Sequence, residues 1–327
     1  MAIILVTGGA GYVGAHACKC LAAAGHDPVV FDNLGTGWRD AVRFGPLIEG
    51  DLLDTAALDA AFAEAKPQAV IHFAALSNVG ESAGKPDLYW RNNVAGSLNL
   101  LTAMQAHRVG RIVFSSTCAT YGEARGDVLV EEDAQAPINC YGRTKLAVER
   151  MLGDFEAAFG LRHVIFRYFN AAGASPDREI GEHHAPETHL IPLALDAVSG
   201  RRGALTIFGT DYPTPDGTCI RDYVHVMDLA DAHLRGVDWL LAGGESLALN
   251  LGSGAGFSVR EVIDTAARVT GAPCPHVEGA RRPGDPPRLV SGSQRAAEVL
   301  GWQPQHSDLG EILADAWAWH QTGKYAR

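Results

Sequence analysis

Short apolar runs alternate with longer stretches of helical spacing through the first half of the chain. The apolar runs are rich in β-branched residues and predict strands at Ile3–Val6, Pro28–Phe31, Leu47–Glu49, Ala69–Phe73, Arg111–Ser115 and His163–Tyr168. The stretches between them predict helices, notably at Tyr12–Ala24, Thr55–Ala65, Asp87–His107 and Tyr141–Phe159. Apolar strands joined by helices are typical of a parallel sheet covered on both faces, so this half predicts a doubly wound α/β domain.

The pattern changes after about Asn170. The segment Ala171–Pro192 is rich in Gly, Pro and His, and it predicts a long loop with short elements. Beyond it the chain predicts a brief strand at Leu205–Phe208 and helices at Leu190–Ser199, Val226–Leu241, Ser258–Thr270 and Asp308–Gln321. We therefore expect two domains, residues 1–170 and a smaller mixed α/β domain of residues 171–327, some segments of which return to the first. The second domain is expected to cap the carboxyl ends of the sheet, where open α/β folds bind ligands.

Composition narrows the class of protein. The 327 residues are 47% hydrophobic and 20% charged, an ordinary balance for a globular protein with a sizeable core. The net charge of −11 at pH 7 would repel phosphate backbones and anionic membranes, so we expect neither nucleic acid nor a membrane as partner. An anionic ligand would need a local cluster of positive groups.

The N-terminus and the cysteines predict a cytoplasmic location. No basic segment or cleavage site precedes the apolar run Ile3–Val6, and the run is too short for a signal peptide or a membrane span. The six cysteines are scattered without the spacing of a disulfide framework, as expected for free thiols in a reducing compartment.

A glycine-rich turn follows the first predicted strand. Gly8, Gly11 and Gly14 form a Gly-x-x-Gly-x-x-Gly run that opens a helix, with Tyr12 and Val13 inside it. Glycines let the backbone approach a pyrophosphate closely, and the N–H groups at the start of a helix favour its charge. In this strand–turn–helix context the run predicts a dinucleotide site on a sheet of the Rossmann type.

Acidic residues after the next two strands indicate which dinucleotide is bound. Asp32 ends the second strand and is followed by Asn33. A carboxylate there accepts hydrogen bonds from both ribose hydroxyls of the adenosine and would repel a 2′-phosphate, so the position favours NAD over NADP. Asp51 and Leu52 close the third strand in a place suited to the adenine.

Candidate catalytic residues follow the fifth strand. Thr117 lies just after it, and Tyr141 and Lys145 stand four residues apart at the start of a predicted helix, hence on one face. A tyrosine hydroxyl has a pKa near 10 and is a poor base at neutral pH. We expect the Lys145 ammonium and a positive nicotinamide to favour the phenolate and to bring Tyr141 towards general-base strength. Lys145 would also bond the nicotinamide ribose, and Thr117 would bridge substrate and phenolate.

These residues, in this order, resemble the extended short-chain dehydrogenase/reductase family over essentially the whole chain. Further segments narrow the resemblance to the UDP-galactose 4-epimerases, namely Phe31–Leu34, His72–Ala75, Arg167–Asn170, Ile207–Tyr212, Arg221–Val226 and Arg282–Asp285. The resemblance implies a tightly held NAD and a UDP-hexose substrate lying across the cleft. It also implies interconversion of UDP-galactose and UDP-glucose, by transient oxidation at C4, rotation of the 4-keto sugar and return of hydride to the opposite face.

The resemblance assigns roles to residues as well. The catalytic set would be Thr117, Tyr141 and Lys145. Besides the glycine turn and the acidic strand ends, NAD would contact Phe73, Ala74, Ala75, Asn92, Ser115, Tyr141, Lys145 and Tyr168. The substrate would contact Thr117, Asn170, His189, Leu190, Phe208, Arg221, Arg282, Asp285 and Leu289. Arg221 and Arg282 would bind the diphosphate, because guanidinium groups suit bidentate phosphate contacts, and Asp285 would hold the uridine ribose.

Three positions depart from the pattern of close relatives. Ser77 stands where relatives often carry lysine, so one cationic contact to the cofactor phosphates is missing. His189 stands where some epimerases have asparagine beside the uridine diphosphate. Leu289 occupies the position that gates sugar size, and it is neither the bulky tyrosine nor the small cysteine seen elsewhere. Epimerases of UDP-N-acetylhexosamines or UDP-pentoses therefore remain alternatives.

Other functions of this fold call for different residues. Nucleotide-sugar 4,6-dehydratases carry an Asp-Glu pair after the threonine, where this chain has Cys118 and Ala119. Decarboxylases of the same fold place a glutamate at the position of Ala119. A non-enzymatic NAD-binding regulator would not need the pair of Tyr141 and Lys145, yet the chain carries both.

Two further expectations concern a metal and the oligomeric state. His183, His184 and His189 lie close together in the long loop, but without regular ligand spacing, so we expect no metal and a loop that folds over the nucleotide. The resemblance implies a homodimer formed through the two helices that begin near Asp87 and Tyr141.

Overall fold

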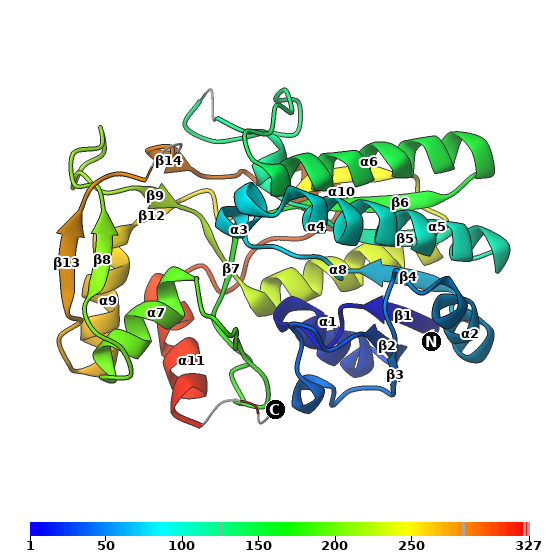
Figure 1. The fold of residues 1–327 in the computed structure, drawn as a ribbon, viewed down its shortest axis with the longest axis horizontal. Helices are drawn as coiled ribbons and strands as arrows, with labels where there is room; N and C mark the ends of the chain where they lie inside the picture. The colour runs from blue at the N-terminus through cyan, green and yellow to red at the C-terminus, as the bar shows by residue number, and fades with distance from the viewer. Residues whose placement is uncertain (124–125, 283–284, 323–324, 326–327) are drawn as a thin grey trace.

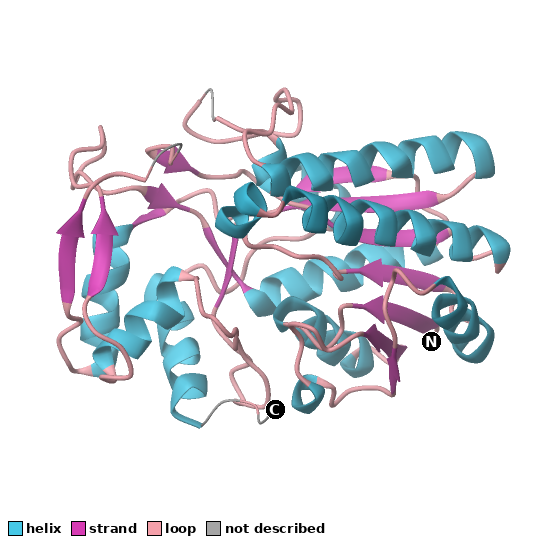
Figure 2. Cartoon of the chain, viewed as in Figure 1, coloured by secondary structure: helices cyan, strands magenta, loops and turns pink. Residues whose placement is uncertain are grey.

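The largest element of the computed structural model is a seven-stranded sheet in the order β11-β6-β5-β4-β1-β2-β3 (Figures 1 and 2). The structure describes residues 1–123, 126–282, 285–322 and 325. All neighbouring strands of the sheet are parallel, which confirms the predicted doubly wound α/β fold. The strands are β1 (Ile3–Thr7), β2 (Asp27–Asp32), β3 (Leu47–Glu49), β4 (Ala69–His72), β5 (Arg111–Ser115), β6 (Arg162–Arg167) and β11 (Leu247–Asn250).

Helices cover both faces of this sheet. In β1, Ile4 and Val6 pack into one core and Leu5 into the other, as the period of two requires in a strand that is buried on both sides. The first face is covered by α1 (Tyr12–Ala23), α8 (Val226–Leu241) and α10 (Gln294–Leu300). The second face is covered by α2 (Thr55–Ala65), α5 (Gly96–Ala106) and α6 (Cys140–Phe159).

The helix predicted at Asp87–His107 is interrupted. It consists of α4 (Pro86–Tyr89), a π-helical turn η2 (Trp90–Ala95) and α5. Within η2, the side chain of Asn93 accepts from the N–H of Leu76 at 2.8 Å and donates to its carbonyl at 3.0 Å. The apolar spacing could not reveal this turn, because it is held by a partner in the preceding loop. Such turns are frequent at functional sites.

A smaller unit lies beside the large sheet, with its helices and short sheets on the left of Figure 1. Its helices share one core with β8. They are α7 (Leu190–Val198), α9 (Val259–Thr270) and α11 (Leu309–Thr322). Its strands pair as β8 (Leu205–Phe208) with β13 (His276–Gly279), β9 (Ile220–Arg221) with β12 (Phe257–Ser258) and β14 (Arg288–Leu289), and β7 (Asn170–Ala172) with β10 (Tyr223–His225).

Three short helices complete the described elements, namely η1 (Arg39–Ala41), α3 (Val79–Gly84) and η3 (Cys118–Thr120). Among the residues that the structure describes, no helix combines the length and the apolar character needed to cross a membrane.

Candidate active site

The predicted cofactor residues meet at one edge of the large sheet. All seven parallel strands have their carboxyl ends there, and the strand order reverses between β1 and β4. Open α/β sheets bind ligands outside such a switch point. Asp32 ends β2, Phe73 follows β4, Ser115 ends β5 and Tyr168 follows β6. Residues far apart in the sequence are therefore aligned along the edge that carries the glycine turn.

The turn between β1 and α1 has room for backbone only. Gly8 has a φ of 76°, and a Cβ on it would lie 2.5 Å from the backbone nitrogen of Ala74. A Cβ on Gly14 would lie 2.2 Å from the carbonyl oxygen of Gly8. Gly11 is the N-cap of α1, so no described side chain caps the first N–H groups of this helix. A bare helix start beside a turn without side chains fits the pyrophosphate of NAD.

The first residues of α1 connect the cofactor turn to the rest of the chain. The Tyr12 hydroxyl donates to the carbonyl of Gly173 at 2.6 Å, which ties α1 to the loop that precedes α7. Val13 packs against the core on its face of the sheet. These contacts orient the start of α1.

Asp32 is buried at the end of β2. Its carboxylate accepts from the N–H groups of Ala10 at 3.0 Å and Leu34 at 2.8 Å, which hold it against the glycine turn. Burial raises the pKa of Asp32, and these two hydrogen bonds oppose the rise. Next to it, the Asn33 amide donates to the carboxylate of Asp51 at 2.8 Å. The residues after β2 and β3 are thus brought together where the adenosine of a dinucleotide is bound in this fold.

The remaining predicted cofactor residues occupy the same edge. Leu52 is buried, and the hydroxyls of Ser115 and Tyr168 share a hydrogen bond of 2.6 Å. The half-buried residues of this group are Phe73, Ala74, Ala75 and Asn92. Partial exposure leaves these side chains accessible to a ligand.

Tyr141 and Lys145 stand one helical turn apart on α6, next to the end of β5. The side chain of Asn139 caps this helix and determines where it begins. The Lys145 ammonium is buried and donates to the carbonyl of Ser115 at 2.8 Å. Thr117, also buried, is hydrogen-bonded to Tyr141. The structure thus brings the three predicted catalytic residues together.

The protonation of this group differs from the sequence-based expectation. Burial raises the pKa of Tyr141 above its ordinary value, the neighbouring Tyr168 raises it further, and the bond with Thr117 lowers it. Burial lowers the pKa of Lys145 to about 7, against the influence of Glu149. The Lys145 Nζ lies 6.0 Å from the ring centroid of Tyr141. In the chain alone burial therefore dominates the pKa of Tyr141, and the expected lowering by Lys145 together with a positive nicotinamide stays a prediction for the NAD-bound protein.

A buried ion pair behind the predicted catalytic residues was not predicted from the sequence. Glu149 lies one turn beyond Lys145 on α6, and its carboxylate accepts from Arg167 Nη2 at 2.7 Å and from Nε at 3.1 and 3.2 Å. Both side chains are under 10% exposed. Glu149 also accepts a hydrogen bond from the hydroxyl of Ser116, the neighbour of Thr117. The one sign of this residue in the sequence was that Glu149 follows Lys145 by four residues, which places both on the same face of the helix.

Two arginines and one aspartate gather on the substrate side. Asp285 forms an ion pair with Arg221 and another with Arg282, the latter with a shortest distance of 2.9 Å. The Arg282 guanidinium also lies 4.9 Å from the ring centroid of Phe208. Three predicted substrate residues from β9 and the segment before β14 are thus in contact. Pro283 and Gly284 of that segment lie outside the described residues.

The other predicted substrate residues come from neighbouring elements. Leu289 on β14 is half-buried and pairs with Arg221 on β9. The Asn170 side chain on β7 donates to the carbonyl of Asp222 at 2.8 Å. His189 is the N-cap of α7 and Leu190 is its first residue. The imidazole of His189 is hydrogen-bonded to Glu182 within the preceding loop.

At the positions that distinguish related reactions, the chain has Cys118 and Ala119, which are unsuited to acid–base catalysis. Cys118 is fully buried, its Sγ lies 3.6 Å from the hydroxyl of Ser291, and burial raises its pKa. The backbone N–H of Ala119 donates to the Thr117 hydroxyl at 3.1 Å. The methyl side chain of Ala119 carries no acidic proton. Ser77 is exposed in the loop between β4 and α3. None of these three side chains carries a carboxylate or an ammonium group.

Known proteins match this arrangement. The NAD dependent epimerase/dehydratase family matches residues 4–252. The UDP-glucose 4-epimerase of Rhizobium leguminosarum bv. trifolii is 53% identical over 317 residues, which cover 97% of each chain. The UDP-glucose 4-epimerase of Brucella ovis in complex with NAD is 51% identical, with a TM-score of 0.95 over 97% of this chain and 98% of the other.

A more distant solved structure gives the same fold with both ligands. The UDP-glucose 4-epimerase of Bifidobacterium longum in complex with NAD⁺ and UDP is 34% identical, with a TM-score of 0.93 over 98% of each chain. The resemblance found in the sequence is therefore confirmed. The chain belongs to the NAD-dependent epimerase/dehydratase family and, within it, to the UDP-glucose 4-epimerases.

Proposed function

We propose that this chain interconverts UDP-galactose and UDP-glucose, with Tyr141 as the proton-transfer group and Thr117 and Lys145 as its partners. The observation that carries the proposal is their convergence at the sheet edge. Lys145 bonds the end of β5, and Tyr141 bonds Thr117 just beyond it. This edge also holds the glycine turn that fits a pyrophosphate. A sugar bound there would lie between the proton-transfer group and the cofactor.

The residues of the chain supply binding, orientation and proton transfer. NAD, when bound, accepts the C4 hydride and returns it, and its positive ring favours the Tyr141 phenolate. Tyr141 removes the proton of the C4 hydroxyl during oxidation and gives it back during reduction. Thr117 holds the same hydroxyl at the end of β5. Lys145, when protonated, would favour the phenolate, and it would bind the ribose of the cofactor.

An epimerase must also let the 4-keto sugar turn while the nucleotide stays in place. Arg221 and Arg282 already lie together around Asp285, and guanidinium groups suit bidentate contacts to a diphosphate. Arrival of the diphosphate would replace part of their pairing with Asp285, whose carboxylate then holds the ribose of uridine. Because the diphosphate stays fixed while only the hexose rotates, either face of C4 can be turned towards the cofactor.

The range of sugars depends on Leu289. Its half-buried side chain is intermediate in size between the gating residues of relatives, and it lies next to Arg221 through the pairing of β9 and β14. UDP-N-acetylhexosamines and UDP-pentoses are therefore the second candidates. Turnover of UDP-galactose, UDP-N-acetylgalactosamine and UDP-arabinose, measured in parallel, separates them.

The proposal extends to a cytoplasmic homodimer. Large apolar side chains are exposed on the helices expected at the interface, with Leu88 on α4 at 41%, Trp90 on η2 at 42% and Leu98 on α5 at 43%. Exposed apolar groups of this kind mark protein interfaces. All six cysteines are free, which agrees with a reducing compartment. Sedimentation of the purified protein tests the dimer.

The decisive experiment compares Tyr141→Phe with the wild type. Loss of the hydroxyl should lower kcat for conversion of UDP-galactose to UDP-glucose by about 10²–10⁴-fold, because the proton-transfer group is removed. The NAD content should not change, since the cofactor is held mainly by the glycine turn and Asp32. Near-normal turnover in a variant that retains NAD would refute the role of Tyr141.

A further inference from the structure

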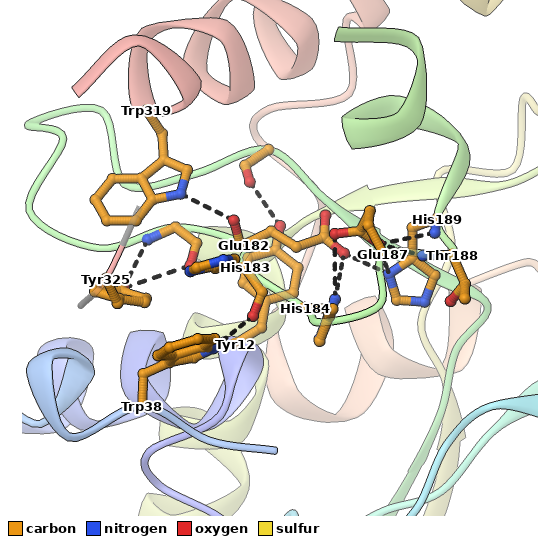
Figure 3. A network of polar contacts seen from close by, with 12 residues as sticks. Tyr12, Trp38, Glu182, His183, His184, Glu187, Thr188, His189, Trp319 and Tyr325 are labelled. Atoms are coloured by element: carbon orange, nitrogen blue, oxygen red, sulfur yellow. Dashed lines mark hydrogen bonds and ion pairs between the residues drawn. The ribbon is translucent and has the colours of Figure 1, made fainter. Parts of the chain in front are cut away.

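Four side chains with metal-binding atoms converge in the loop that precedes α7. Glu182, His184, Glu187 and His189 each offer one nitrogen or oxygen, and these atoms all lie within 4.8 Å of one another (Figure 3). Proton transfer at the sheet edge uses none of them. Only His189 has an expected role, as a contact of the nucleotide.

The separations within this cluster match the edges of a small coordination shell. His184 Nδ1 lies 3.2 Å from a Glu182 oxygen and 3.6 Å from a Glu187 oxygen. His189 Nδ1 touches the same Glu182 oxygen and lies 3.9 Å from the other oxygen of Glu187. Four ligands at zinc–nitrogen and zinc–oxygen distances in a tetrahedron are about 3.3 Å apart. Small side-chain adjustments would therefore place all four atoms around one ion.

Burial makes a positive partner necessary here. The side chains of Glu182 and Glu187 are only 6% and 8% exposed. Two carboxylates removed from water need compensating charge. His184 Nδ1 is buried beside oxygens of both carboxylates, so a protonated imidazole there is one possible positive partner. A metal cation that displaced this proton would compensate both carboxylates and bind the nitrogen lone pair that is freed.

Surrounding groups hold the ligands in place. One oxygen of Glu187 accepts from the N–H groups of Thr188 at 2.7 Å and His189 at 2.9 Å. The backbone carbonyl of Glu182 accepts from the indole of Trp319 on α11 at 2.9 Å. Metal-binding carboxylates are typically oriented by supporting hydrogen bonds of this kind.

The histidine that sequence reasoning grouped with this site belongs elsewhere. The ring of His183 stacks on Trp38, with centroids 4.2 Å apart and planes at 6°. The linear pattern of three histidines argued against a metal, but it left out Glu182 and Glu187. In the folded loop, two of the three histidines lie together with these two carboxylates, which gives four candidate ligands.

We propose that Glu182, His184, Glu187 and His189 bind one divalent transition metal, zinc by the chemistry of the donors. Two imidazoles with two carboxylates suit zinc, whereas magnesium and calcium prefer oxygen ligands alone. Four protein ligands make a closed site, so the metal acts on structure and not as a reagent. This site shares only His189 with the expected nucleotide contacts and uses none of Thr117, Tyr141 and Lys145.

The location of the site indicates a structural role for the metal. Tyr12 at the start of α1 bonds Gly173 in the same loop, and its ring lies 6.4 Å from that of His184. His189 is the N-cap residue of α7, and Leu190 is the first residue of that helix. A metal would thus fasten the loop between the cofactor helix and the substrate-side helix. It would position His189 and Leu190 before any nucleotide arrives.

The test is the metal content of the untagged, NAD-loaded protein, measured by elemental analysis after dialysis against metal-free buffer. We expect about one zinc per wild-type chain. We expect His184→Ala and Glu187→Gln to weaken zinc binding at least about 100-fold, beyond the usual effect of losing a supporting hydrogen bond. His276→Ala, which removes an exposed imidazole on β13, is the matched control and should retain the zinc. No UDP-sugar is present, so the result is independent of the proposed reaction.

A second measurement uses only the wild-type protein, so it applies even if the variants fail to fold. Wild-type protein stripped with a chelator is titrated with cobalt(II), which should saturate at one equivalent, show the intense visible bands of a tetrahedral site and be displaced by zinc. Zinc should also raise the thermal midpoint of the stripped protein, because it binds the folded state. The proposal is overturned if the wild type holds no zinc and cobalt gives no saturable signal, which would make the cluster an ion-pair network of protonated histidines. Equal zinc in wild type, His184→Ala and Glu187→Gln would also overturn it.

Discussion

Replacing Glu149 by glutamine tests the buried ion pair next to the end of β5, where the proposed catalytic residues lie. Its carboxylate accepts three contacts from Arg167 at 2.7 to 3.2 Å and one from Gln135 at 2.8 Å. The side chains of Glu149 and Arg167 are 4% and 8% exposed. Removing one partner of a buried pair leaves an uncompensated charge and costs about 3–5 kcal/mol. Since glutamine retains the shape and one acceptor oxygen, we expect a loss of about 3 kcal/mol, the lower end of that range.

The matched control is Glu156→Gln on the same helix. Glu156 pairs with Arg162 at 2.7 Å, but these side chains are 29% and 50% exposed, so the pair should contribute less than about 1 kcal/mol. Thermal unfolding with saturating NAD, followed by circular dichroism, measures both variants. At roughly 2 °C per kcal/mol, Glu149→Gln should lower the midpoint by about 6 °C and Glu156→Gln by about 2 °C or less. Equal shifts for the two variants would show that burial of the Glu149 pair does not have the assigned effect.

Two further predictions concern the cofactor turn and Lys145. Gly14→Ala puts a methyl group 2.2 Å from the Gly8 carbonyl, so NAD content should fall and stability should drop by about 1–3 kcal/mol. Gly153→Ala on α6, where a Cβ meets nothing within 4 Å, should be neutral or stabilising, and NAD retention equal in the two variants would contradict the steric argument. The pKa of Lys145 is about 7 in the folded chain against 10.5 ordinarily, so between these values the unfolded chain binds more protons and wild-type stability gains with rising pH. In urea unfolding of NAD-free protein, the stability difference between Lys145→Met and wild type should therefore shift in favour of the wild type from pH 7 to pH 10, and a constant difference would contradict the lowered pKa.

Several features of this protein depend on local sequence and were predictable from it. Apolar runs and helical spacing identify β1, α1, β4, β5 and α6 to within a residue or two, because each element must bury its own apolar face. The glycine turn follows from the need for backbone without side chains at Gly8 and Gly14. The pairing of Tyr141 with Lys145 follows from four-residue spacing on one helix.

Other features depend on contacts between distant segments, and only the folded chain decides them. The strand β11 joins the large sheet beside β6, although its short run gives no sign of a partner more than 80 residues away. Asp285 meets Arg221 across 64 residues of sequence. The raised pKa of Tyr141 arises from burial, which no neighbouring charge in the sequence reveals.

The amino-acid sequence alone therefore determined the fold class and the glycine turn, and it predicted the candidate catalytic residues. The tertiary structure decided which charges are buried, which side chains share them and where Glu182 and Glu187 meet the two histidines. The physical reason is that helix and strand patterns are set by neighbours a few residues apart. Electrostatic environments depend on desolvation and on distances between elements, which exist only after the chain has packed.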